Sequence, residues 1–205
     1  MIQKDIERIK SRANIIHKII KFIFFLGVMI FFAGLVASIL FFFASPEKFN
    51  AVKGNLNWSI NYTLDNGSKF FIVIPFKIIQ PLDSSMFSAK YAIITYLLSS
   101  LFGLCLILYG IKQIVNILKS TARDITPFIM DNAKSLKKLA YSIIIYSLVS
   151  DILSNILCSI FVTKIFFIDL SNIHLIRVLV GVLIFVIAEI FQYGVYLQNE
   201  YDTTL

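Results

Sequence analysis

The sequence predicts an all-α integral membrane protein with four transmembrane helices in an antiparallel up-down bundle and a small extracytoplasmic β-hairpin between the first two helices. Hydrophobic residues make up 58% of the 205 residues and charged residues only 15%, which is too few to cover a water-soluble surface. Four apolar blocks approach or exceed the ~20 residues that a helix needs to cross the hydrocarbon of a bilayer. The loop after the first block alternates apolar and polar residues, which is typical of a strand.

The whole chain, 1–205, is expected to form a single membrane domain. A basic amphipathic helix comes first, lying on the inner leaflet or running straight into the first span. The first span is longer than the apolar part of a signal peptide, ~7–15 residues, and is therefore interpreted as an anchor. The expected segments are the N-terminal helix 1–21, spans at 22–44, 91–111, 139–163 and 173–197, an extracytoplasmic loop at 45–90, a cytoplasmic connection at 112–138 and a cytoplasmic tail at 198–205.

The distribution of lysine and arginine predicts that both termini are cytoplasmic. Six basic residues precede the first span and six more occupy the connection 112–138, whereas the connection between the third and fourth spans has only Lys164 and Arg177. The sequence therefore predicts a multi-pass membrane protein. Its formal net charge of +7 is attributed to topology and to contact with anionic inner-leaflet lipids, and not to direct binding of nucleic acid.

The extracytoplasmic loop carries the signals of the hairpin. Trp58, Ile60 and Tyr62 alternate with polar residues, and the turn sequence 65–68, Asp-Asn-Gly-Ser, follows. The second strand would lie within 69–79, where Pro75 weakens its later part. The apolar face would rest on the helices or the membrane, either as a structural cap or as a contact surface for a peptide, a lipid or an envelope component.

The cytoplasmic connection is expected to be helical on both sides of a break. The rhythm of apolar residues in the second span continues beyond Lys112. Thr126 can cap a new helix that has Pro127 at its first position, where the missing N–H costs nothing. This helix would carry three lysines, at 134, 137 and 138, into the third span.

Two acids interrupt the last two apolar blocks, Asp151 in the third and Glu189 in the fourth. A carboxylate at the centre of a span costs about 2.5–3.5 kcal/mol on insertion scales, so it requires a partner, a proton or a wet cavity. Ser147, Asp151 and Ser154 share one helical face with Cys158, and Asn155 lies beside them. We expect this polar face to turn inward and to bring Asp151 within reach of Glu189.

No lysine or arginine is expected at the depth of the two acids. We therefore expect one or both acids to be protonated, or to bond to serine, asparagine, tyrosine or Gln192. Three roles stay open for this polar core: contact between helices, a proton- or ligand-linked switch, and part of an ion path.

The sequence shows no nucleophile–base arrangement, phosphate-binding loop or metal-ligand spacing. It therefore predicts a protein that is not an enzyme and that has no catalytic residues, metal or cofactor. Cys105 and Cys158 are expected at different depths and unpaired.

Two segments resemble a family of small four-span bacterial membrane proteins, common in Firmicutes and classified as a domain of unknown function. The first segment reads P-F-x-x-x-N-x-x-x-L, and the second reads I-F-x-Y-G-x-x-L-Q-x-E-x-D-x-T-L. Asp124 departs from the family, in which glycine is usual at that position. The matching residues are Pro127, Phe128, Asn132, Leu136, Phe191, Gly194, Leu197, Gln198, Glu200 and Asp202.

The resemblance implies an association with a small helix-turn-helix regulator of the Xre type and makes Glu189 part of a recurring motif. Glu200 and Asp202 could pair with lysines 134, 137 or 138. We therefore expect a regulatory or sensory protein that couples the envelope or the bilayer to a cytoplasmic partner such as a transcription regulator. The alternatives are a small transporter and an immunity protein against a membrane-active peptide; a homo-oligomer also stays open.

Overall fold

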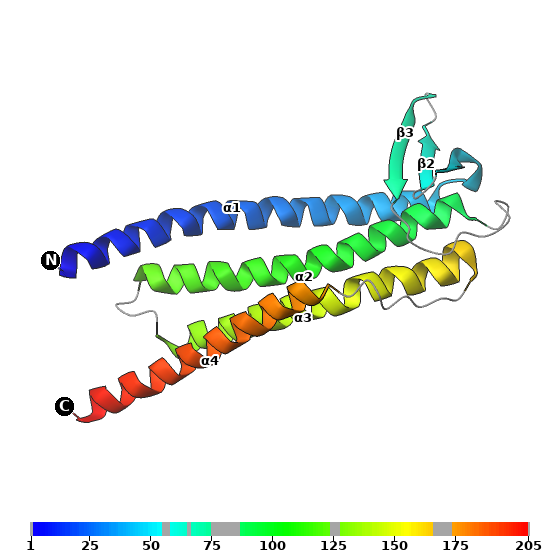
Figure 1. The fold of residues 1–205 in the computed structure, drawn as a ribbon. Helices are drawn as coiled ribbons and strands as arrows, with labels where there is room; N and C mark the ends of the chain where they lie inside the picture. Colours follow the sequence, from blue (N-terminus) through cyan, green and yellow to red (C-terminus); the bar gives the residue numbers. More distant parts are fainter. Residues whose placement is uncertain are drawn as a thin grey trace. The chain divides into compact units, whose positions relative to one another are not determined.

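A computed structural model describes residues 2–54, 58–64, 67–74, 87–123, 128–165 and 174–204 (Figure 1). Four helices are long and apolar enough to cross a membrane, and a small sheet lies between the first two in the chain. This confirms the predicted fold class. The elements are α1 (Ile2–Phe43), a 3-10 turn (Pro46–Lys48), β1 (Phe49–Lys53), β2 (Trp58–Thr63), β3 (Lys69–Ile74), α2 (Ala89–Arg123), α3 (Met130–Cys158), a π-helical turn (Ser159–Thr163) and α4 (Leu175–Thr204).

The helices expose apolar side chains instead of burying them. On α1, Phe22, Phe25 and Ile30 are each about 60% exposed, at 62%, 59% and 63%. Water would penalise such a surface, whereas acyl chains solvate it. The exposed apolar surface and the lengths of the helices together indicate a multi-pass membrane protein.

Contacts divide the chain into two compact units. The terminal unit contains Met1–Ile30, Leu104–Leu148 and His174–Leu205, and the sheet unit contains Phe31–Gly103 and Val149–Ile173. Helices α1, α2 and α3 contribute to both units, whereas α4 belongs to the terminal unit.

Consecutive helices of the terminal unit pack antiparallel. Ser120 near the end of α2 bonds to Asn132 near the start of α3, and earlier in α2 Gly110 lies against Ser142 of α3. On the other side of α3, Gly181 of α4 lies so close to Ile144 that an added Cβ would be 2.5 Å from its Cγ1 atom. Small residues permit such close approach where no apolar–water contrast drives helices together.

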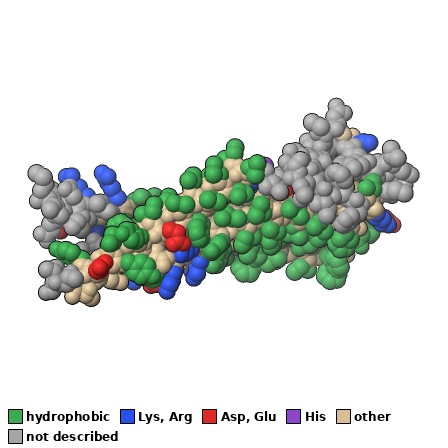
Figure 2. All heavy atoms as spheres, turned by 60° about the horizontal axis from the view of Figure 1, so that its bottom comes forward, with side chains coloured by type: hydrophobic (Ala, Val, Ile, Leu, Met, Phe, Trp, Pro, Cys, Tyr) green, Lys and Arg blue, Asp and Glu red, His purple; other side chains and the backbone are tan. Residues whose placement is uncertain are grey.

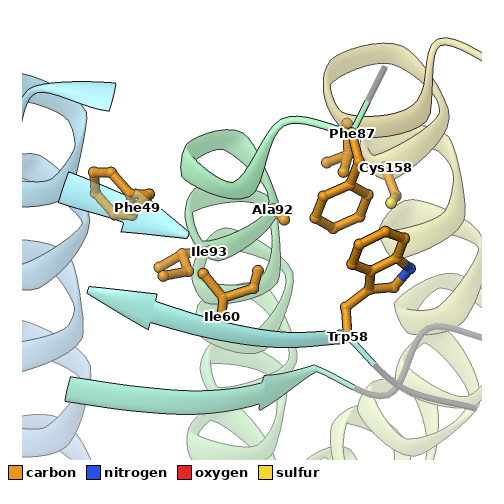
Figure 3. Packing of buried hydrophobic residues seen from close by; sticks show 8 residues of the cluster. Phe49, Trp58, Ile60, Phe87, Ala92, Ile93 and Cys158 are labelled. Atoms are coloured by element: carbon orange, nitrogen blue, oxygen red, sulfur yellow. The ribbon is translucent and has the colours of Figure 1, made fainter. Parts of the chain in front are cut away.

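The sheet has the order β1-β2-β3, with both pairs antiparallel. Trp58 and Ile60 of β2 are 3% and 0% exposed and point toward α2 and α3 (Figure 3). Gly67, with φ +82°, closes the β2–β3 turn, and Leu64 and Ser68 bond across it at 2.8 Å. The predicted hairpin is thus confirmed, while β1 was not predicted. Strand β3 ends at Ile74; Pro75 and the rest of the predicted second strand lie outside the described residues.

Helix boundaries resolve two expectations and correct a third. Helix α1 is continuous, so the N-terminal helix runs straight into the first span. Helix α2 continues to Arg123, as the sequence indicated. The predicted start of the next helix at Pro127 is wrong: α3 begins at Met130, and the carbonyl of Ile129 accepts the first intrahelical bonds. Thr126 and Pro127 themselves lie outside the described residues.

Candidate functional site

The sheet unit contains an open cavity of about 970 Å³. Strands β1 and β2, the start of α2 and the π-helical turn after α3 form its walls. This volume is at the upper end of the range of small-molecule sites, roughly 300–1,000 Å³. Its principal side chains are Trp58, Phe87, Lys90, Tyr91, Phe161 and Lys164.

Aromatic side chains fix the wall of this cavity. Trp58 stacks on Phe87 with ring centroids 3.9 Å apart and planes 6° apart, and Figure 3 shows the two rings face to face. Ser88 donates its amide to Val162 at 3.4 Å, which ties the start of α2 to the π-helical turn. The turn leads into Lys164, whose φ of 56° is unusual for a residue with a side chain. Irregular helical turns of this kind are frequent at functional sites.

The chemistry of the cavity is aromatic and cationic. Lys90 and Lys164 line it, and none of the described lining residues is acidic. Lys90 also lies 5.9 Å from the ring centroid of Phe42. Such a site suits a ligand with an apolar body and a negatively charged or strongly polar group.

The terminal unit contains a different polar site, centred on Lys137 of α3. The Nζ atom of Lys137 is 2.8 Å from Glu189 Oε1 and 2.7 Å from Gln192 Oε1, both on α4. It also lies 5.8 Å from the ring centroid of Phe185. Gln192 in turn donates to the hydroxyl of Tyr196 at 3.3 Å. One lysine thus links two helices through an ion pair and a hydrogen bond.

This arrangement corrects the prediction that no lysine or arginine lies at the depth of Glu189. The flexible stem of Lys137 carries its ammonium group to Glu189. The side chain of Glu189 is 49% exposed, so it lies at the rim of the α3–α4 contact and not in an enclosed core. Figure 2 shows acidic and basic side chains side by side on a face that is otherwise largely hydrophobic.

The other predicted core residues are divided between the units. Ser147, 1% exposed, belongs to the terminal unit and donates to the carbonyl of Ile143 at 2.8 Å. Asp151, Ser154 and Asn155 are half-buried in the sheet unit, with the Oδ2 atom of Asp151 shielded from the surface. A meeting of Asp151 with Glu189 would join the two units and stays a prediction.

The two motif segments meet within the terminal unit. The rings of Phe128 and Phe191 are 5.0 Å apart, and a Cβ added to Gly194 would lie 2.8 Å from Phe128. Asn132, 2% exposed, accepts a hydrogen bond from Ser120. Leu136 belongs to α3, and Leu197, Gln198, Glu200 and Asp202 belong to α4. Pro127 and the side chain of Asp202 lie outside the described residues.

Both motif segments lie within the part of the chain that matches a known family. Residues 55–205 match the family described as "Protein of unknown function (DUF2975)". The chain belongs to the DUF2975 family. Searches of curated proteins and of solved structures found no match. Membership in DUF2975 therefore supports a common architecture and leaves the activity to be inferred from the sites.

Sequence reasoning missed the cavity of this DUF2975 protein, because its walls come from segments about 100 residues apart. The alternation that placed Trp58 inward was a usable signal. The sequence carried no comparable signal for the π-helical turn or for the conformation of Lys164. Within the described residues, no group of three His, Cys, Asp or Glu side chains could hold a metal ion, and both cysteines are free thiols.

Proposed function

We propose that this DUF2975 protein is a regulatory or sensory protein of a bacterial cytoplasmic membrane. It would receive a signal on the envelope side, or from the bilayer, and pass it to a cytoplasmic partner. The proposal follows the positive-inside rule in assigning both termini to the cytoplasm and the sheet to the envelope side.

The observation that carries the proposal is the cavity of about 970 Å³ in the sheet unit. Its walls combine two strands, the start of α2 and the π-helical turn after α3, so a ligand bound there would contact elements that continue into the spans. A ligand shifts an equilibrium only by its differential affinity for two states. Walls drawn from separate elements provide contacts that change when these elements move.

The Lys137 site supports the output side of the proposal. An ion pair at the rim of two helices, with Glu189 half exposed, is a polar contact that a small helix shift can break or make. The basic end of α2, the basic start of α3 and the tail of α4 would then present different surfaces to the partner. The resemblance noted from the sequence makes a helix-turn-helix regulator the partner that we propose.

A complementation experiment tests this role. The gene is deleted, transcripts are profiled, and the loss is complemented with the wild-type chain, with a Lys90→Gln/Lys164→Gln variant or with Lys53→Gln. We expect the wild type and Lys53→Gln to restore the profile and the double variant to fail, because Lys53 is exposed on β1 and does not line the cavity. A deletion that leaves transcripts unchanged, together with no regulator co-purifying from native membranes, would refute the proposal.

The two alternative functions, transport and immunity, each predict a different experimental result. A transporter would give pH-dependent flux in liposomes that Asp151→Asn abolishes. An immunity protein would protect the cell from a co-encoded membrane-active peptide, and loss of the gene would sensitise it. Either result would replace the regulatory proposal.

A further inference from the structure

A second, smaller pocket lies in the terminal unit, where α2 ends and α3 begins. Its volume is about 490 Å³. Lys119 and Arg123 line it from the last turns of α2, and Lys134 and Lys138 line it from the first turns of α3. These side chains lie on two antiparallel helices, so their charges converge on one pocket from two sides.

The charges in this pocket are unbalanced. Four cations face it and one acid, Asp131, accompanies them. All five side chains are exposed, and none of them forms an ion pair within the part of the chain that the structure describes. By contrast, Lys137, which lies between Lys134 and Lys138 in sequence, forms an ion pair with Glu189. Among the described residues that line the pocket, four cations thus face one carboxylate, Asp131.

The walls of the pocket add fixed polar groups. The N-terminal end of α3 contributes Ile129, Asp131 and Asn132, and a helix N-terminus carries partial positive charge. Asn132 is held by Ser120, and Gln113, 5% exposed, donates to the carbonyl of Tyr109. These bonds within and between α2 and α3 keep the floor of the pocket in place before any ligand arrives.

We infer that this pocket binds a phosphate group, as a lipid headgroup or as a free phosphate anion. Guanidinium and ammonium groups converging beside a helix N-terminus match the charge and oxygen geometry of phosphate. Basic pockets between transmembrane helices are a recurring form of headgroup site. The inference does not depend on the regulatory role, since the pocket can hold a phosphate whatever signal the sheet unit receives.

Equilibrium binding to the full chain in neutral detergent tests this inference. The probes are phosphatidylglycerol, phosphatidylcholine and inorganic phosphate, each titrated separately. The pocket variant carries Lys119→Gln, Arg123→Gln and Lys134→Gln. The control carries Lys10→Gln, Arg12→Gln and Lys18→Gln on α1, which removes the same charge away from the pocket.

We expect phosphatidylglycerol to bind in preference to phosphatidylcholine, and the pocket variant to weaken this binding by more than about tenfold, with a much smaller loss in the control. Inorganic phosphate that binds with the same dependence on the variants, without phosphatidylglycerol binding, would support the pocket and identify a free anion as its ligand. Equal losses of binding in both variants would overturn the inference, and so would no binding of phosphatidylglycerol or of inorganic phosphate.

Asp131→Asn provides a test with the opposite sign and does not depend on a heavily altered protein. Removing the acid of the pocket should strengthen binding of the same phosphate probe by about twofold to fivefold. An unchanged or weakened affinity would show that the probe binds elsewhere, and would also overturn the inference.

Discussion

The sheet unit and the terminal unit are stabilised in different ways. The sheet unit buries large side chains in one cluster, including Phe49, Trp58 and Phe87. In the described part of the terminal unit, no aromatic side chain is buried; alanines and small polar residues such as Ala140 and Ser147 fill the contacts. The sheet unit therefore resembles a water-soluble core, whereas the terminal unit uses the close packing and polar contacts of helices in lipid.

The largest expected effect is in the sheet unit, from Trp58→Ala. Trp58 is 3% exposed and stacked on Phe87, and removing such a buried aromatic side chain costs about 3–5 kcal/mol of stability. Hydrogen exchange of the reconstituted protein should show loss of protection in the three strands, with less change in α4.

Phe71→Ala is the matched control. Phe71 lies on β3 but is 58% exposed, so its removal should change stability by less than about 0.5 kcal/mol. Equal loss of protection throughout the chain after Trp58→Ala would show that the two units unfold together and that their difference in packing has no energetic meaning.

A smaller effect is expected in the terminal unit, from Lys137→Met. This change removes the ion pair and the hydrogen bond, leaving Glu189 without its cation on an apolar surface. Hydrogen bonds to charged groups are typically worth about 1.5–3 kcal/mol, and we expect a loss in that range. Unfolding in a denaturing detergent measures it, with loss of protection concentrated in α3 and α4.

The double variant Lys137→Met/Glu189→Met distinguishes a balanced pair from simple packing. With both charges removed, the apolar pair should recover most of the lost stability. Lys134→Met, at an exposed neighbouring lysine, should have little effect. A double variant as unstable as Lys137→Met alone would show that the lysine acts through its contacts with Phe185 and Gln192 and not through its ion pair with Glu189.

The sequence was informative where periodicity is local. Alternation placed Trp58 and Ile60 inward on β2, and runs of apolar residues predicted the four helices. It could not predict β1, because Phe49–Lys53 is short and lacks a clear alternation, and its strand conformation depends on pairing with β2. The start of α3 was predicted too early for a related reason. Residues such as Thr126 and Pro127 favour a helix start nearby, but tertiary contacts decide at which residue the helix begins.

Side-chain reach limited the prediction of the polar site. The depth of each residue in the membrane was estimated by counting residues from the end of its span, and this estimate placed Glu189 away from every lysine. The contact exists because α4 packs beside the first half of α3 and because a lysine stem spans several ångströms. The sequence singled out Glu189 and Gln192 and expected Glu189 to meet the third span, but the side chain of α3 that contacts both is Lys137, which periodicity within one segment cannot reveal.

The smallest effect in this comparison is expected at the motif contact of the terminal unit. In Gly194→Ala, the new Cβ would lie 2.8 Å from Phe128, so the ring, which is 39% exposed, must shift. We expect a loss of about 1 kcal/mol, the low end for overpacking, measured by the same unfolding assay. In a Phe128→Ala background the clash is absent, and alanine should instead stabilise α4 by up to about 1 kcal/mol through its higher helix propensity. The sign of the Gly194→Ala effect thus depends on one ring; the same sign in both backgrounds would mean that the two motif segments do not pack as the structure places them.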